Sequence, residues 1–236
     1  MLQTRQSSLR SLSAKFSPGH CIDWHAHDWA QLIYATKGAM TVAAGNTRWV
    51  VPSRRAIWVP AGREHQIEMH GRVFLRTVYV PTKTKTRSRD CEVLDITSLF
   101  HELINHVCNR GIVHGESTVD RTLIRFFRQQ LSALRPVNSE LRVPRDPRAR
   151  RFASYILDNP DSTESLSRIA NQCCTSLRTL QRLFPQEIGT SVSKWRHQVR
   201  MHRAIELLGD NESVTSVAYS LGFESVSAFI HSFKQC

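Results

Sequence analysis

The sequence contains no apolar run long enough to cross a membrane. Its first ten residues mix polar, basic and apolar side chains and lack the apolar core of a signal peptide. No later stretch approaches the roughly 18 uncharged apolar residues of a membrane-spanning helix. We therefore expect a soluble cytoplasmic protein with no membrane partner.

The cysteines form no Cys-x-x-Cys pair. In a reducing compartment, such scattered cysteines are expected to be small buried apolar residues rather than a disulfide framework. One alternative stays open, because the adjacent pair Cys173 and Cys174 could sense oxidants. The full set is Cys21, Cys91, Cys108, Cys173, Cys174 and Cys236.

Acidic residues are also few, with 20 Asp and Glu against 32 Lys and Arg, so the formal net charge is +12. This balance indicates an anionic partner, of which nucleic acid is the commonest. The excess is not concentrated near the C-terminus, since residues 1–144 hold 20 basic and 11 acidic side chains. An argument for DNA binding must therefore rest on motif geometry.

Short apolar segments typical of strands fill residues 20–80, and turn-forming residues separate them at hairpin spacing. The expected turns are Lys37-Gly38, Gly45-Asn46, Pro60-Ala61-Gly62 and Gly71. The expected strands are 31–34, 40–42, 47–51, 56–59, 65–69 and 73–80. This pattern predicts a small antiparallel barrel or sandwich, followed by a polar, basic connector at 81–90.

A helical period replaces the strand pattern after Ile96. Apolar residues recur at helical spacing over 99–107 and 123–134 and predict two helices. A proline-rich segment at 135–147 predicts an interdomain linker, and the remaining chain is expected to be helical. The expected domains are a sensor barrel at 1–90, a helical dimerisation segment at 91–135, a linker at 136–147 and a DNA-binding domain at 148–236.

Residues 166–184 have the pattern of a helix-turn-helix motif. Such a motif needs a small residue where its helices touch, a tight turn, a capping residue and an apolar inner face. Ala170 is the small residue, residues 173–175 make the turn, and Ser176 is the cap. The outward side chains of the second helix suit contacts to bases or phosphates in a major groove. They are Arg178, Thr179, Gln181 and Arg182.

The same layout returns about 49 residues later, which a chance pattern would rarely produce. Ala218 is the small residue, the turn at 222–224 is one residue longer, and Ser225 is the cap. Between the motifs, an apolar stripe predicts one connecting helix with Arg196, Arg200 and Arg203 on its other face. The stripe is Val192, Trp195, Val199, His202, Ile205 and Leu208. Such a helix would hold two reading helices about one DNA turn, roughly 34 Å, apart.

These motifs make the C-terminal part similar to the AraC/XylS family of transcription regulators. The resemblance covers about residues 148–236 and rests on segments 177–184, 200–208, 214–218 and 222–234 and on Gly189. It implies that the outward positions of each second helix read DNA. In the second motif this set is weakly polar, so it either contacts thymine methyl groups and phosphates or contributes little specificity. It comprises Ser225, Val226, Ser227, Ile230 and His231.

Two features depart from the family pattern. Cys174 stands at a turn position that often holds glycine, where a left-handed side chain costs about 1 kcal/mol. The chain also ends at Cys236, where the family normally continues with a glycine, a proline-containing segment and a last short helix. We therefore expect an apparently truncated second motif, with Phe229 and Phe233 less covered and DNA binding weakened.

Two histidine motifs in the N-terminal part are similar to those of cupins. The first is Gly19-x5-His25-x-His27-x3-Gln31-x6-Gly38, and the second is Pro60-x-Gly62-x2-His65. Histidines two apart on a strand face the same way, so His25, His27 and His65 are expected to converge with Gln31 inside the barrel. Three imidazoles at such spacing can hold Zn, Ni, Mn or Fe(II).

The alternative is a pocket for a small organic effector in which the histidines hold no metal. Gln31 replaces the cupin glutamate and Met69 replaces the cupin asparagine, and a neutral ligand set binds divalent ions less strongly. Tryptophans are candidates for lining such a pocket, although most aromatic residues in a small barrel are core. They are Trp24, Trp29, Trp49 and Trp58.

The expected fold class is α+β with two domains, an antiparallel cupin-like β-barrel with a helical dimerisation segment and an all-α domain with two helix-turn-helix motifs. The leading function is sequence-specific regulation of transcription, as activator or repressor, controlled by a small molecule or metal. No catalytic residue is assigned, because Gln31 supplies neither acid nor base. Expected partners are double-stranded DNA, a second copy of the chain, the effector and RNA polymerase. Two alternatives stay open, a truncated regulator with impaired DNA binding and a cupin metalloenzyme with an appended helical domain.

Overall fold

The computed structural model describes residues 8–81, 87–137 and 140–235. Tertiary contacts divide the chain into two compact units, one of residues 1–45 and 49–140 and one of residues 46–48 and 141–236. Among the described residues, no helix is both long enough and apolar enough to span a membrane.

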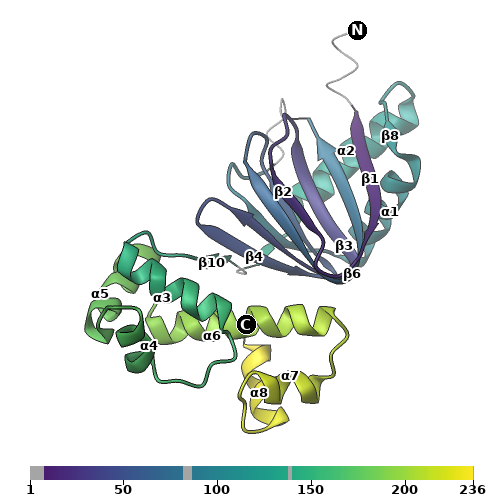
Figure 1. Cartoon of the computed structure of the whole chain (residues 1–236). Helices are drawn as coiled ribbons and strands as arrows, with labels where there is room; N and C mark the ends of the chain where they lie inside the picture. The colour runs from purple at the N-terminus through teal and green to yellow at the C-terminus, as the bar shows by residue number, and fades with distance from the viewer. Residues whose placement is uncertain (1–7, 82–86, 138–139, 236) are drawn as a thin grey trace. The chain divides into compact units, whose positions relative to one another are not determined.

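The N-terminal unit is built on an antiparallel sheet with two helices (Figure 1). Neighbouring strands follow the order β8-β1-β6-β3-β5-β7-β9, and β2 and β4 pair with β6 and β3, respectively. The antiparallel sheet and the two following helices confirm the predicted architecture of this part. The strands are β1 (Leu9–Phe16), β2 (Cys21–His25), β3 (Ala30–Ala44), β4 (Thr47–Pro52), β5 (Arg55–Val59), β6 (His65–Val80), β7 (Glu92–Asp95), β8 (Ile112–Val113) and β9 (Pro136–Val137), and the helices are α1 (Ser98–Arg110) and α2 (Thr118–Ala133).

The two longest strands are each interrupted by a β-bulge rather than by a turn. β3 and β6 pair from Ala30 opposite Val80 to Ala43 opposite Gln66, with register shifts around Lys37. The predicted turns at Lys37-Gly38 and Gly71 are therefore wrong. Gly38 has φ +80°, and a Cβ there would lie 2.9 Å from a backbone oxygen of β6, so glycine lets the bulged strands stay paired.

The sequence pattern also did not predict strand β1. This strand carries few apolar side chains, and only Leu9 is fully buried, so its periodicity is weak. Its place is fixed by pairing with β6, from Arg10 opposite Tyr79 to Phe16 opposite Val73. Tertiary pairing thus supplies what local alternation does not.

Opposite faces of the sheet bury two different cores. Leu32 and Tyr34 of β3 join an outer core with the helical residues Phe100 and Phe127. The intervening Ile33 belongs to an inner core formed by strand residues alone. Figure 1 shows α1 and α2 on one side of the sheet, which leaves the inner face for the histidine motifs.

The C-terminal unit is helical and has two cores, one for each helix-turn-helix motif. The N-terminal half of α6 buries Trp195 in the first core, and its C-terminal half buries Met201 and Ala204 in the second. The predicted single stripe is therefore only half right, because His202 and Ile205 are half-buried rather than fully buried. The elements are β10 (Glu140–Arg142), α3 (Pro147–Asp158), α4 (Leu166–Gln172), α5 (Leu177–Ile188), α6 (Val192–Gly209), α7 (Val214–Ser220) and α8 (Val226–Lys234).

The described cysteines are free thiols, as expected, but they are not uniformly buried. Cys108 is buried in the outer core. Cys21 and Cys174 are exposed, so the expectation of buried cysteines is wrong for both. Cys21 is the first residue of β2, and Cys174 lies in the turn of the first helix-turn-helix motif with a left-handed backbone, whereas its neighbour Cys173 packs against the core. Cys236 lies outside the described residues.

Candidate functional site

The first helix-turn-helix motif consists of α4 and α5. Ser176 caps α5, as predicted, with its hydroxyl accepting a hydrogen bond from the Thr179 backbone N–H at 3.1 Å. The turn closes when the Thr175 backbone N–H donates to the Ala170 carbonyl, 3.0 Å away. Cys174 has φ +54°, so this side chain does occupy the left-handed conformation expected from the sequence.

The second motif, α7 and α8, repeats this construction. The Phe223 backbone N–H donates to the Ala218 carbonyl at 3.0 Å, and Ser225 caps α8 by accepting from the Ala228 N–H at 3.1 Å. Gly222, with φ +73°, follows its buried alanine by the same four residues as Cys174 follows Ala170. The repeat predicted from the sequence is confirmed at the level of single hydrogen bonds.

The outward face of α5 presents three exposed polar side chains. Arg178, Gln181 and Arg182 are exposed. Arg182 donates to the Gln186 side chain at 3.2 Å, a weak surface contact that DNA could replace. The Thr179 hydroxyl is different, because it is 2.9 Å from the Ser176 hydroxyl and belongs to the cap. Base or phosphate contacts from this helix are therefore best assigned to the two arginines and the glutamine.

The outward face of α8 is smaller and less polar. Ser227, Ile230 and His231 are exposed, whereas Val226 packs against the second core and the Ser225 hydroxyl is used in the cap. Only Ser227 and His231 among these exposed side chains offer hydrogen-bonding groups.

The expected loss of cover is wrong for the first of the two α8 phenylalanines. Phe229 is only 1% exposed, because it packs between the rings of Phe223 and Phe233, each at 5.4 Å between centroids. Phe233 itself is half-buried. The described part of the second motif therefore has its own packed core.

The arginines of α6 tie the two motifs to the connecting helix. Arg196 donates to the backbone carbonyls of Glu164, at 2.7 Å, and Ser162, both in the loop before α4. The Arg200 guanidinium lies over the ring of Phe223, in the turn of the second motif. Two arginines of the predicted polar face of α6 therefore make contacts within the protein. Burial lowers the pKa of both guanidinium groups.

Three histidines converge on the inner side of the N-terminal sheet. His25 ends β2 and lies opposite His65, the first residue of β6, while His27 lies in the loop before β3. One ring nitrogen from each histidine lies within 4.8 Å of the corresponding nitrogens of the other two. The predicted convergence is therefore present, but His27 is not on a strand as expected. The Gly62 backbone N–H fixes this loop by donating to the His27 carbonyl at 2.8 Å.

Backbone carbonyls orient two of the rings. Nδ1 of His25 lies 2.7 Å from the Asp23 carbonyl, and Nδ1 of His65 lies 3.0 Å from the Arg63 carbonyl. Because a carbonyl only accepts, each Nδ1 carries the proton and each Nε2 keeps its lone pair. This is the arrangement that backbone groups impose on metal-binding histidines.

Buried polar atoms without a partner surround the same point. Nε2 of His27, Nε2 of His65 and Oε1 of Gln31 have no hydrogen bond to any described residue. Gln31 and His65 are only 4% and 1% exposed, respectively. Unpaired buried acceptors cost about 1–3 kcal/mol each, so their clustering points to a ligand or ion that would satisfy them.

Burial favours the neutral form of two of these imidazoles. It lowers the pKa of His65 to about 4. Burial, followed by the neighbouring His25, also lowers the pKa of His27. Neutral imidazoles are the form that coordinates metals. Metal–nitrogen bonds of about 2.1 Å place tetrahedral ligand atoms about 3.4 Å apart, so small side-chain rotations would suffice to close the site.

The four tryptophans do not form one pocket. Trp49 lies in the inner core, whereas Trp58 lies in the outer core and donates from Nε1 to the Ser88 carbonyl at 3.1 Å. Trp24 is 47% exposed, and Trp29 packs under the Arg10 guanidinium. A cavity lined by all four is therefore not formed, because Trp49 and Trp58 belong to cores on opposite faces of the sheet and Trp24 is exposed.

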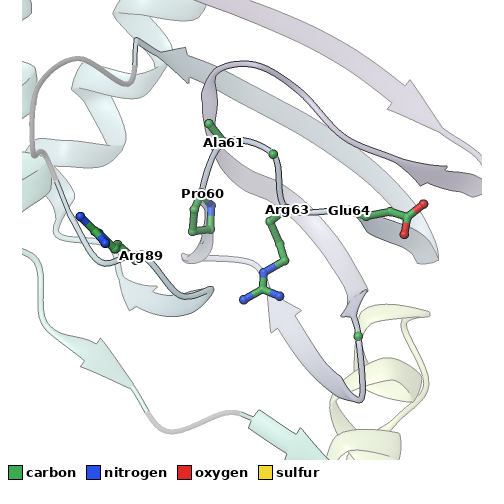
Figure 2. A pocket seen from close by; sticks show the side chains of 7 residues that line it. Pro60, Ala61, Arg63, Glu64 and Arg89 are labelled. Carbon is green, nitrogen blue, oxygen red and sulfur yellow. The ribbon is translucent and has the colours of Figure 1, made fainter.

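An open pocket of about 480 Å³ lies beside the β5–β6 loop (Figure 2). Its lining residues are Gly45, Pro60, Ala61, Gly62, Arg63, Glu64 and Arg89. None of the three histidines lines it, although the same loop holds His27 and His65 through its backbone. The loop therefore helps to position two of the three histidines.

One residue beside the centre could not be found from the sequence. Tyr79 pairs with Gln31 across β3 and β6, and its ring meets the ring of His27 edge-on at 5.2 Å. It lies far from both cupin-like motifs in the sequence, and only strand register brings it here. No local pattern marks this tyrosine.

Comparisons with known proteins agree with both halves of this description. Residues 12–143 match the AraC-like ligand binding domain, and residues 169–236 match a helix-turn-helix domain. The chain is 31% identical over 211 residues to the HTH-type transcriptional regulator NimR of Escherichia coli (strain K12), covering 89% of this chain and 77% of that protein.

Two further proteins are more distant. The chain is 31% identical over 141 residues to the arabinose operon regulatory protein of Escherichia coli (strain K12), covering 58% of this chain but only 48% of that protein. The crystal structure of ToxT from Vibrio cholerae O395 matches 96% of this chain and 92% of its own, with 13% identity and a TM-score of 0.41, too low to support an argument. The chain belongs to the AraC family of transcription regulators, with an N-terminal AraC-like, cupin-type ligand-binding domain and a C-terminal helix-turn-helix DNA-binding domain.

Proposed function

We propose that the protein is an effector-controlled regulator that reads its operator mainly with α5. The observation that carries this proposal is the exposed set Arg178, Gln181 and Arg182 on a capped helix, compared with the weakly polar face of α8. Arginine and glutamine recognise guanine and adenine through paired hydrogen bonds, whereas Ile230 offers only apolar contact. A regulator of this kind works on DNA in the cytoplasm.

Selection from random DNA duplexes tests this assignment. The full chain should enrich one sequence, and substitutions in the part read by α5 should weaken binding more than those in the part read by α8. Each mismatch in a well-read position costs about 1–3 kcal/mol. No enriched sequence at low salt, or equal sensitivity of both parts, would contradict the proposal.

We further propose that His25, His27 and His65 hold a divalent metal, with Gln31 or water completing the shell. The supporting observations are the convergence of the three rings, the Nδ1 contacts of His25 and His65 with backbone carbonyls, and the unpartnered Nε2 atoms of His27 and His65. Imidazole ligands suit Zn, Ni and Fe(II) better than Ca or Mg, and Mn also accepts them. When bound, the ion supplies a Lewis-acidic position for a ligand.

Elemental analysis tests the metal centre. Protein purified without chelator or histidine tag should carry metal, and the double variant His25→Ala, His27→Ala should lose it. The analysis also identifies the ion. The same trace metal in parent and double variant would show that the histidines bind no ion, and would reassign them to an organic effector.

A second copy of the chain is the proposed occupant of the outer face of α1 and α2. Val119 is 73% exposed and Phe126 is 38% exposed, and their spacing of seven places them on one side of α2. Leu99 of α1 is 56% exposed.

Sedimentation of the full chain should show a dimer that Val119→Glu with Phe126→Glu converts to a monomer. A monomeric parent at tens of micromolar, where weak pairs still form, would contradict dimerisation. RNA polymerase is the additional partner that activation would require.

A further inference from the structure

The proposed ligands of the histidine centre bring no negative charge, and the inference drawn from this rests on the metal site proposed above. Imidazoles coordinate a metal in their neutral form, and backbone carbonyls accept from two of the three rings. The Gln31 amide carries no charge either. The described residues add no carboxylate to the histidine cluster. A bound divalent ion would therefore keep both positive charges.

Nearby acidic groups do not change this balance. Asp28 is the acidic residue whose charge acts on His27, but its side chain is exposed and outside the cluster. Water screens such an exposed charge strongly. Asp23 contributes its backbone carbonyl to His25.

The absence of a negative ligand matters for a bound ion because the histidine centre lies in the protein interior. His65 and Gln31 are buried, and the attraction between opposite charges is several times stronger in a protein interior than in water. An uncompensated ion in such a place favours an anionic ligand from outside the chain. Tyr79 adds a phenol beside the centre, since its ring meets His27 and it lies opposite Gln31 on the sheet.

We propose that the centre recognises its effector as a small oxygen anion, which binds the metal at the position that Gln31 leaves without a carboxylate. Gln31 is then a specificity-determining residue. A glutamate there would neutralise the ion from within the chain and would compete with the external anion. Metal affinity and anion affinity should therefore change in opposite directions when this side chain gains a charge.

The test uses the full chain loaded with Co(II), whose visible absorption reports the ligands of the ion. Oxalate is the anionic probe, and oxamide is the uncharged molecule of similar shape, both at constant ionic strength. Oxalate should shift the spectrum of the parent with a saturable dissociation constant while cobalt stays bound, and oxamide should not. Metal content after gel filtration shows whether cobalt stayed.

The variants supply the second readout. Gln31→Glu should bind Co(II) about tenfold more tightly and oxalate about tenfold more weakly than the parent. Gln129→Glu makes the same charge change at an exposed position of α2, and both affinities should stay at parent values. If Gln31→Glu fails to fold, the oxalate and oxamide titrations of the parent decide alone.

The outcomes separate the two proposals. Cobalt that stays bound and ignores oxalate, or responds equally to oxamide, would overturn the anionic effector while leaving the metal centre intact. A Gln31→Glu variant with unchanged oxalate affinity would also overturn it. Cobalt spectra that do not differ between the parent and the His25→Ala, His27→Ala variant would overturn both.

Discussion

The Arg200 guanidinium lies 5.7 Å from the centroid of the Phe223 ring. This contact joins the connecting helix α6 to the turn of the second helix-turn-helix motif. The turn also approaches the loop before α4, because a Cβ on Gly222 would lie 2.9 Å from Nη2 of Arg200 and 3.2 Å from Cγ2 of Thr163. A side chain at Gly222 would therefore have to displace the Arg200 guanidinium, which contacts this turn.

Gly222→Ala should lower the free energy of unfolding by about 2–4 kcal/mol, because it combines a left-handed residue with a steric contact. Gly189→Ala is the matched control, since Gly189 has a similar φ of +72° and nothing within 4 Å of the added methyl group. Gly189→Ala should lower the free energy of unfolding by only about 1–2 kcal/mol, which is the cost of a left-handed backbone at a residue with a side chain. Urea unfolding of both variants measures the difference, and equal losses would show that the contact with Arg200 is unimportant.

Cys174→Gly should raise the free energy of unfolding by about 0.5–1 kcal/mol, because it removes the strain of a side chain at φ +54°. The neighbouring Cys173 is the control, since its φ of −86° suits any residue. Cys173→Gly should destabilise the protein instead. A stabilising effect of both substitutions, or of neither, would contradict this account of the turn.

Arg182→Ala should weaken specific DNA binding by about 1–3 kcal/mol without changing the unfolding transition. Arg203→Ala is the comparison, since Arg203 lies on α6 and pairs with Glu206 at 3.1 Å. Fluorescence anisotropy on the selected operator at fixed salt gives both dissociation constants. Parent-like affinity of Arg182→Ala would remove this side chain from the reading face.

Acid should destabilise the C-terminal unit through His202. Burial lowers the pKa of this histidine to about 4, although Glu206 acts in the opposite direction. The unfolded chain, with an ordinary pKa near 6.5, then binds more protons than the folded protein between about pH 4 and 6.5. Stability is therefore full above about pH 6.5 and falls as the pH drops toward 4. His202→Gln should flatten this dependence in chemical unfolding, and an unchanged slope would contradict the assignment.

Much of the DNA-binding half could be predicted from the sequence, because its determinants are local. Caps such as Ser176 and Ser225 act on backbone groups three residues away, so their spacing is visible in the chain. The contact between Arg200 and the turn of the second motif could not be predicted. The sequence pattern of an arginine on a helix surface is the same whether the side chain contacts water or a distant turn.

In the sensor half, less of the structure could be predicted from the sequence. The histidine motifs predicted which side chains meet, since their spacing survives in the fold. The sequence did not predict that Lys37-Gly38 bends one continuous strand, because a glycine marks a turn and a bulge equally well. Tyr79 depends on the register between β3 and β6, which local sequence does not contain.

One measurement tests most directly whether the histidine centre controls DNA binding. It is the dissociation constant of the full chain for its operator, compared between metal-loaded and metal-free protein. Both states must be compared at one salt concentration, because phosphate contacts make affinity strongly salt-dependent. We predict a difference of at least about fivefold, the lower end of ordinary coupling between two sites. We also predict no difference in the His25→Ala, His27→Ala variant. The same dissociation constant for loaded and stripped parent protein would contradict the account.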